Sequence, residues 1–355
     1  MPANAALKGV AAAIIVLAAV LAFALLRDES PSAPATGIEK VVWKYSLWGP
    51  PRAFTRGIEK AAELWETAGN GRFELQINYG SALSPEKENL DSIKLGLIEG
   101  AYVCVGYGPN KTPLAQVLEL PFLLTKDMRV NTAVIDAVMQ HPLIEEELAT
   151  RWNAKYLMVA AVGVYEFMGN KRVANLEDLK GTRMRISGAN ATILEKFGAV
   201  PTMVTAPESY TALERGTIDM TGFPWTDSFG AFRLHEVSSH ATLGISLSGF
   251  TCLNLVSLDA WNRMPEDLKA MLPEVREQAT QASFEAFDEA DNEWLPIFEK
   301  KLEISRFPER DREKMVAAAR PLWREWAQQQ DSKGLKGSEI LQFTMEQVAT
   351  LSAAP

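Results

Sequence analysis

The sequence predicts an α/β protein built as a two-lobed, clamshell-like binding fold with a long helix bracing both lobes. Three observations support this prediction. The chain of 355 residues exceeds the usual length of a single domain. Strand-like segments alternate with amphipathic helices over residues 41–108, and do so again from about residue 157. A helical stretch over residues 266–298 follows both sets, where a strut between two lobes would lie.

The first set of elements predicts a parallel, doubly wound sheet. "VVWKYSLWG" and "RFELQINYG" are typical of strands, and an amphipathic helix over about residues 52–67 connects them. Ser84 and Pro85 fit the N-cap and first turn of a second helix, before the strand "AYVCVGYG". Ligands of such sheets bind at the carboxyl ends of the strands. We therefore expect Trp48 and Tyr107 to lie near a crevice.

The second set repeats this alternation. "LMVAAVGVYEFMGN", "RMRISG" and "IDMTGFPW" are typical of strands, and "NATILEKFG" and "SYTALERG" are helical. The predicted boundaries are 1–37 for a signal peptide or N-terminal anchor and tether, 38–162 for lobe I, 163–251 for lobe II, about 252–288 for a return to lobe I, and about 289–355 for C-terminal helices that pack on lobe II.

Composition and motifs exclude several classes of protein. A net charge of −9 and the absence of a basic patch with aromatic residues argue against nucleic acid as a partner. The sequence contains no GxSxG, Walker, HExxH or complete GxGxxG motif. The three histidines lack the spacing of metal ligands. We therefore predict a protein that is not an enzyme and that carries no metal or cofactor.

The N-terminus predicts export. Lys8 precedes the apolar run "GVAAAIIVLAAVLAFALL", and "APA" at residues 33–35 fits a cleavage site. The run is long for a signal core and approaches the length of a spanning helix, so an uncleaved anchor is the alternative. Both interpretations place the remainder of the chain outside the cytoplasmic membrane, which predicts a periplasmic protein.

The two cysteines are Cys104 and Cys252, and both lie in apolar strand-like segments. Buried free thiols are the favoured interpretation, because cysteine in such segments behaves as a small apolar residue. A disulfide is the alternative in an oxidising compartment.

The stretch "DLKGTRMRIS" places two arginines on one predicted strand of an acidic protein. Side chains on a strand alternate between faces, so Arg183 and Arg185 point one way and Met184 and Ile186 the other. The apolar pair fits the core. The arginine face then needs solvent, a carboxylate of the protein, or an anionic ligand, and spacing alone leaves Arg185 divided between the last two.

Aromatic residues gather at or beyond the predicted strand ends. Each could serve only in core packing. Together, at the mouths of two α/β lobes, they fit a cleft that encloses an organic ligand. The candidate ligand-binding residues are Arg185, Trp48, Tyr107, Tyr165, Phe223 and Trp225.

Four segments carry a resemblance to a known family. They are "NLEDLKGTRMRISG" (175–188), "GAVPTMVTAPESYTALERGTID" (198–219), "LDAWNRMPEDLKAML" (258–272) and "DSKGLKGSEIL" (331–341). Over residues 41–351 the chain resembles the extracytoplasmic solute receptors of tripartite ATP-independent periplasmic (TRAP) transporters, the DctP-type family. This resemblance implies a clamshell that closes on its ligand, and small and large membrane subunits as partners.

The resemblance also implies roles for single residues. Arg185 occupies the position of the arginine that grips the ligand carboxylate, and Arg183 becomes a solvent or hinge residue. Phe223 replaces an asparagine frequent in sialic-acid and dicarboxylate receptors, and Gly222 replaces the glutamate of receptors that recruit a cation. Tyr165 stands near a further basic position. These departures favour a monocarboxylate with an apolar or aromatic body.

The resulting functional prediction is a periplasmic receptor that binds a small organic acid and delivers it to a TRAP permease. The alternative is a receptor of the same fold that presents its ligand to a membrane sensor kinase. An enzyme of unrecognised type is the third hypothesis, and turnover of a bound acid would be its sign.

Overall fold

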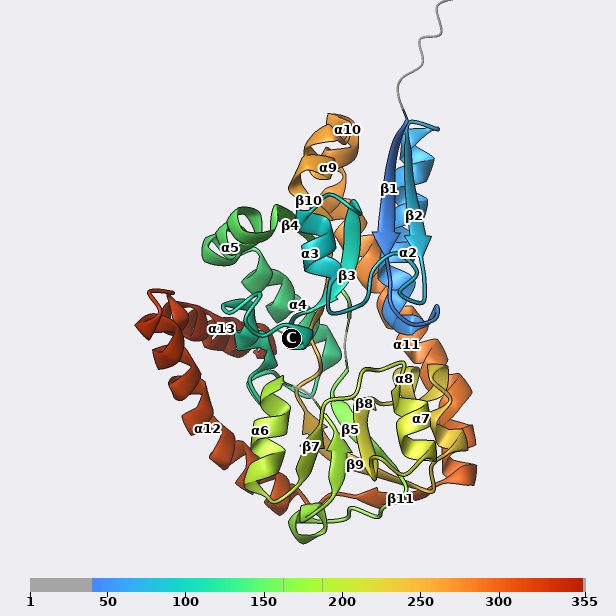
Figure 1. Ribbon diagram of the computed structural model, residues 1–355, viewed down its shortest axis with the longest axis vertical. Coiled ribbons are helices and arrows are strands. Elements are labelled where there is room, and N and C mark those ends of the chain that lie inside the picture. The colour runs from blue at the N-terminus through green and yellow to red at the C-terminus, as the bar shows by residue number, and fades with distance from the viewer. Residues whose placement is uncertain (1–39, 162, 187, 354–355) are drawn as a thin grey trace, which may run out of the picture. The chain divides into compact units, whose positions relative to one another are not determined.

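Two mixed β-sheets organise the protein. The structure, a computed structural model, describes residues 40–161, 163–186 and 188–353. The first sheet has the strand order β2-β1-β3-β10-β4 (Figure 1). Its strands are β1 (Val41–Ser46), β2 (Phe73–Asn78), β3 (Gly100–Cys104), β4 (Ala154–Val159) and β10 (Cys252–Ser257). β1 runs parallel to β2 and β3, and β10 runs antiparallel to β3 and β4.

Helices pack on this sheet and, with it, form lobe I. α2 (Arg56–Gly69) connects β1 and β2 and buries Ile58 and Trp65. It ends where Asn70 adopts a left-handed conformation, with φ 45°, which asparagine tolerates well. Trp65 packs edge-on against Trp43 of β1 at 6.2 Å between ring centroids. The other helices here are α3 (Asn89–Lys94), α4 (Met128–Met139), α5 (Pro142–Trp152), α9 (Leu258–Arg263) and α10 (Glu266–Ala270).

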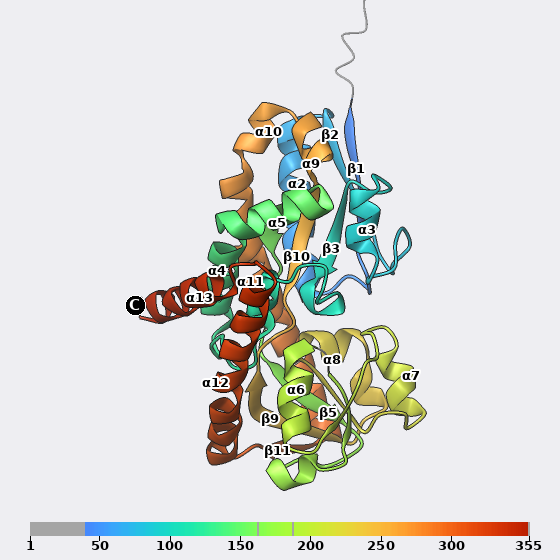
Figure 2. The same cartoon turned by 60° about the vertical axis from the view of Figure 1, so that its left-hand side comes forward.

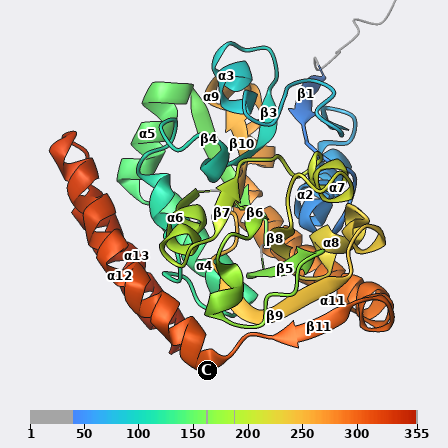
Figure 3. The same cartoon turned by 60° about the horizontal axis from the view of Figure 1, so that its bottom comes forward.

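The second sheet has the strand order β11-β9-β5-β8-β6-β7 and, with its helices, forms lobe II (Figure 3). Its strands are β5 (Tyr165–Gly169), β6 (Arg183–Arg185), β7 (Val200–Thr202), β8 (Met220–Pro224), β9 (His240–Leu247) and β11 (Glu303–Arg306). Its helices are α6 (Gly188–Lys196), α7 (Ser209–Glu214) and α8 (Asp227–Ala231). Short 3₁₀ turns complete the two lobes: η1 (Ala53–Thr55), η2 (Val105–Tyr107), η3 (Ala115–Glu119), η4 (Leu176–Leu179) and η5 (Leu234–Glu236).

The three strands of the first set, β1, β2 and β3, run parallel as expected, but each complete sheet also contains antiparallel strands. The chain passes from β4 to β5 and returns from β9 to β10, so each lobe receives a strand through a crossing from the other. These strands enter antiparallel: β10 in lobe I, and β5 beside β8 and β9 in lobe II. The crossings bring residues 160–161, 163–165 and 247–252 into the junction between the lobes.

The long helix α11 (Leu272–Lys301) braces both lobes, as the sequence predicts. It packs against α2 of lobe I and against α8 of lobe II (Figure 1). Its contact with α2 is close at Gly57, where an added Cβ would lie 2.7 Å from Ser283 Oγ. A side chain at position 57 would therefore displace the Ser283 hydroxyl at this contact. Pro296 lies inside the helix without ending it.

Two C-terminal helices connect the lobes on another side. α12 (Glu309–Ser332) runs from β11 toward lobe I, and α13 (Gly337–Ser352) packs against α4 (Figure 2). His141 and Phe343 meet edge-on at 4.8 Å between ring centroids. Of residues 289–355, expected to pack on lobe II, α12 contacts β9 and α6 of that lobe, whereas α13 lies against lobe I.

Two local expectations are corrected. α3 begins at Asn89, and Ser84, expected as its N-cap, instead shares a hydrogen bond with Ser92 at 2.9 Å between hydroxyl oxygens. The expectation of free thiols is wrong, because Cys104 and Cys252 form a disulfide. The antiparallel pairing of β3 with β10 places these two residues directly opposite each other.

None of the helices in the described ranges is long and apolar enough to cross a membrane. The apolar run that predicts a signal peptide or anchor lies outside the described residues.

Candidate ligand-binding site

A narrow cavity lies where the loops of the two lobes meet. Lobe I lines it with Trp48, Arg52, Phe54 and Tyr107, and lobe II lines it with Tyr165, Arg185 and Phe223. About 10 Å³ is open to the centre of a water molecule. That is close to the room needed for a single water, so the walls must separate to admit an organic acid. The structure therefore brings together five of the six predicted site residues.

Arg185 lies at the carboxyl end of β6 and is 1% exposed. Its Nε–H donates to the carbonyl of Val204 and its Nη1–H to the carbonyl of Gly222, both at 3.0 Å. The guanidinium carbon lies 4.1 Å from the centroid of the Phe223 ring. Among the ion pairs of the described residues, none includes Arg185. A fully buried positive charge is thus held by carbonyls and a ring face, with no carboxylate against it.

Arg183, two positions earlier, has a different environment. It lies at the other end of β6, where its Nε–H donates to Asp219 Oδ2 at 3.1 Å. Its side chain is 46% exposed. The ion pair with Asp219 lowers the pKa of that carboxyl. The two arginines predicted on one strand face therefore divide into a surface ion pair and a buried, unpaired cation.

Two tyrosines flank the guanidinium of Arg185. Burial raises the pKa of Tyr165 well above its ordinary value, and the nearby charge of Arg185 opposes this shift. Burial likewise raises the pKa of Tyr107, and the nearby charges of Arg185 and Arg52 lower it in part. Both phenols are therefore neutral at physiological pH and can donate hydrogen bonds. The Tyr107 hydroxyl accepts from the Ala206 N–H at 3.4 Å, which joins the two lobes.

Gly222 is tightly enclosed. A Cβ added there would lie 2.7 Å from Ile186 Cδ1 and 3.5 Å from the rings of Phe167 and Tyr165. No side chain fits at this position without displacing its neighbours. Between the described residues, no group of three His, Cys, Asp or Glu side chains is placed to hold a metal ion. Gly222 supplies no carboxylate, and a larger side chain here would first have to displace Ile186.

The predicted aromatic residues separate into two groups. Trp48 is 5% exposed, packs against Tyr102 and Tyr107, and lines the cavity. It therefore belongs to the core and to the cavity wall together. Trp225 is not among the cavity-lining residues. Its ring packs 5.3 Å from that of Phe298 on α11, just past the end of β8 at Pro224.

Sequence reasoning missed a second arginine. Arg52 lies in the loop after β1 and lines the same cavity from lobe I. Its guanidinium carbon is 4.6 Å from the Trp48 ring centroid and 5.4 Å from that of Phe232. The loop "WGPPRAF" has no periodicity that would indicate this inward direction. The one available signal was its place at the carboxyl end of a strand.

Glu119 was also missed. It is 2% exposed, and its Oε1 accepts the Thr251 N–H at 2.6 Å at the junction between the lobes. Burial raises its pKa to about 8. Its Oε2 is buried with no hydrogen-bond partner among the described residues. A protonated carboxyl at neutral pH fits this environment, because a charged one would lack compensation.

A two-lobed α/β fold that encloses a cavity between its lobes, with a buried unpaired arginine on the wall, defines a solute-binding receptor. The family model described as bacterial extracellular solute-binding protein, family 7 (DctP) matches residues 47–330. The chain belongs to this family, the extracytoplasmic solute-binding proteins of TRAP transporters.

Three relatives illustrate the match. A solute-binding protein of Verminephrobacter eiseniae is 31% identical over 192 residues, which cover 52% of this chain and 55% of that protein. The C4-dicarboxylate-binding periplasmic protein DctP of Rhodobacter capsulatus is 26% identical over 70% of this chain and 74% of its own length. A crystal structure of a marine metagenome TRAP solute binding protein specific for aromatic acid ligands, in complex with metahydroxyphenylacetate, aligns with a TM-score of 0.77. It is 21% identical, and the alignment covers 88% of this chain and 99% of that one.

Proposed function

We propose that this protein is a periplasmic receptor that binds a small organic acid with an apolar or aromatic body between its lobes. Arg185 holds the carboxylate of the acid, and the receptor delivers the acid to the small and large membrane subunits of a TRAP permease. The apolar run after Lys8 acts as the export signal or as an anchor.

The observation that carries this proposal is the burial of Arg185 without an acidic partner. Removing a guanidinium from water is costly unless a counter-charge and hydrogen bonds compensate for it. The carbonyls of Val204 and Gly222 satisfy two of its five N–H groups, and the side chain lines the cavity. A ligand carboxylate supplies the missing negative charge. The bound solute thus neutralises the buried positive charge of Arg185.

Contacts across the cavity support a clamshell mechanism. The Phe54 N–H of lobe I donates to Asp227 Oδ1 of lobe II at 3.3 Å, and Tyr107 meets Ala206. Opening the lobes breaks these contacts and gives the acid access. A ligand that touches both lobes then favours the closed arrangement, because its contacts form only there.

The walls favour a ligand with an apolar body. Trp48, Phe54 and Phe223 supply ring faces to a cavity whose polar groups are concentrated at the arginines and tyrosines. The related receptor for aromatic acids binds ligands of this kind. Tyr165 and Phe223 stand where some family members carry polar groups, which argues against a sugar acid.

A thermal-shift screen of the purified mature chain against organic acids, followed by calorimetric titration of those that stabilise it, tests the proposal. A ligand at 100 times its Kd should stabilise the protein by about 2.7 kcal/mol. We expect one or more acids to bind with 1:1 stoichiometry and to be recovered unchanged. Failure of every acid tested, with stabilisation by sugars or amines instead, would contradict the proposal.

A further inference from the structure

The cavity contains a second guanidinium whose hydrogen-bonding groups are incompletely used. Arg52 Nη1–H donates to the carbonyls of Pro50 and Trp48, at 2.8 and 3.3 Å. Its Nε and Nη2 are buried and have no hydrogen-bond partner within the described part of the chain. Nε–H and Nη2–H lie along one edge of the guanidinium, the fork that matches the two oxygens of a carboxylate. This edge of Arg52 lacks an acceptor.

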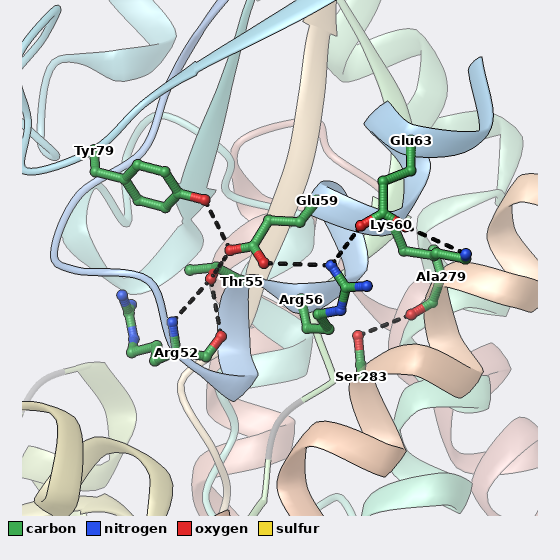
Figure 4. Close-up of polar contacts among 9 residues, drawn as sticks. All are labelled: Arg52, Thr55, Arg56, Glu59, Lys60, Glu63, Tyr79, Ala279 and Ser283. Carbon is green, nitrogen blue, oxygen red and sulfur yellow. Dashed lines mark hydrogen bonds and ion pairs between the residues drawn. The ribbon is translucent and has the colours of Figure 1, made fainter. Parts of the chain in front are cut away.

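Local structure fixes the position of Arg52. Its backbone N–H donates to Thr55 Oγ1 at 3.0 Å, and its carbonyl accepts from the same hydroxyl at 2.8 Å (Figure 4). Gly49, with φ 73°, leaves room for the guanidinium, since a Cβ there would lie 2.9 Å from Arg52 Nη1. The side chain is therefore held against Trp48 before any ligand arrives, which reduces the entropy lost on binding.

The acidic side chains closest to this loop are engaged elsewhere. Glu59 Oε1 accepts from the Tyr79 hydroxyl and shares the Thr55 hydroxyl proton with the Arg52 carbonyl, and the other oxygen of Glu59 faces Arg56 (Figure 4). Asp227 accepts from the Phe54 N–H and from Ser228 Oγ. Neither carboxylate forms an ion pair with Arg52 among the described residues. Burial raises the pKa of Asp227 and the charge of Arg52 opposes this shift, so Asp227 acts on Arg52 through space without forming an ion pair with it.

The two arginines approach one cavity from opposite lobes. Arg185 lies over Phe223, Arg52 lies beside Phe232, and these two rings are stacked at 5.9 Å between centroids. The charges of both arginines act on the pKa of Tyr107. A ligand in the cavity would therefore meet a guanidinium from each lobe.

We propose that Arg52 is a specificity-determining residue that binds a second oxyanion, a carboxylate or sulfonate, at the end of the ligand remote from Arg185. This inference rests on the proposed function, because it assumes that an organic acid occupies the cavity. It replaces the expected monocarboxylate by an acid with two acidic groups, because Arg52 adds a second cation beside Arg185. It also gives lobe I a charged contact of its own, so that a doubly acidic ligand links the lobes on closure.

The test is a cycle that combines a protein substitution with a ligand substitution. Calorimetry measures Kd for matched acids with one or two acidic groups: benzoate, benzene-1,3- and 1,4-dicarboxylate with their monomethyl esters, and pentanoate with pentanedioate. The proteins are the unaltered chain, Arg52→Gln, Arg52→Lys and the control Arg56→Gln. Arg56 lies four residues along the same segment but pairs with Glu63 at the surface. Arg56→Gln thus removes the same charge outside the cavity.

We expect at least one diacid to bind the unaltered chain about tenfold or more tighter than its ester or matched monoacid. Arg52→Gln should remove most of that preference, because it weakens diacids more than monoacids. Arg52→Lys should recover only part of it, because lysine lacks the fork. Arg56→Gln should preserve it. If Arg52→Gln fails to fold, Arg52→Lys and the esters provide the same comparison.

Two results would overturn the inference alone: monoacids binding as tightly as every diacid, or Arg52→Gln weakening monoacids and diacids equally. The second result would assign Arg52 a structural role. If no acid binds the unaltered chain, the proposed function fails as well, so the two failures are distinguishable.

Discussion

Replacing Arg185 by alanine should abolish most of the affinity for acids and have little effect on the unliganded fold. The side chain makes two hydrogen bonds to carbonyls at 3.0 Å and a contact with the Phe223 ring at 4.1 Å. Their loss destabilises the fold, but the substitution also removes a buried charge that lacks a counter-ion. These effects oppose each other, so we expect the free energy of unfolding to change by less than about 2 kcal/mol.

Affinity should respond much more strongly. Breaking an enclosed guanidinium–carboxylate pair costs about 2–5 kcal/mol, much of it because the remaining charge is stranded. This range corresponds to a rise in Kd of about 30-fold to 4,000-fold. Arg185→Lys should recover only part of the loss, since one ammonium cannot contact the carbonyls of Val204 and Gly222 and also grip a carboxylate in a bidentate manner.

The assay is calorimetric titration with an acid found by thermal shift, alongside urea unfolding of each variant without ligand. Arg183→Ala is the matched control, because Arg183 lies on the same strand but pairs with Asp219 at the surface. It should bind the acid with unchanged Kd. A Kd for Arg185→Ala within threefold of the original value, or equal losses in the two variants, would refute the assignment of Arg185.

Three further predictions concern the walls and the junction between the lobes. Binding should not require a metal, since Gly222 brings no carboxylate to the cavity and hard cations need several oxygen ligands; loss of binding in EDTA that calcium restores would contradict this. Ligand should change tryptophan fluorescence, and Trp48→Phe should remove more of that change than Trp225→Phe, because Trp48 lines the cavity; an equal loss would count against the cavity assignment. The unfolded chain releases the Glu119 proton near pH 4.5 and the folded chain near pH 8, so the stability that this proton supports should fall as pH rises through that interval. Glu119→Gln should flatten the decline in unfolding free energy and the exposed Glu146→Gln should not; an unchanged slope in Glu119→Gln would show that another group controls it.

The fold was predictable wherever short-range patterns decide it. Strand alternation and helix periodicity located both sets of elements, and the long helix α11 was confirmed as the brace between the lobes. Strand direction depends on the crossings between the lobes, which no local pattern records. For the same reason, free thiols were preferred to the disulfide, which was only the alternative. The disulfide depends on the register that places Cys104 opposite Cys252, residues far apart in the sequence.

The residues of the site likewise separate into those that a local pattern indicates and those that depend on tertiary contacts. Arg185 was predictable because strand alternation separates it from Met184 and raises the question of its partner. Arg52 follows two prolines in a loop, where the direction of a side chain depends on tertiary contacts with Trp48 and Thr55. The position of Trp225 depends on the end of β8 at Pro224, which the sequence alone did not locate.

The central claim is that an organic acid binds between the lobes with its carboxylate on Arg185. The most direct test is a crystal structure of the protein with the acid that stabilises it most. The account predicts the carboxylate within hydrogen-bonding distance of the Arg185 guanidinium, with the ring faces of Trp48 and Phe223 against the body of the ligand. Density for the acid elsewhere, such as the surface groove between α12 and α13 beside Leu341 and Met345, with Arg185 unliganded, would contradict it.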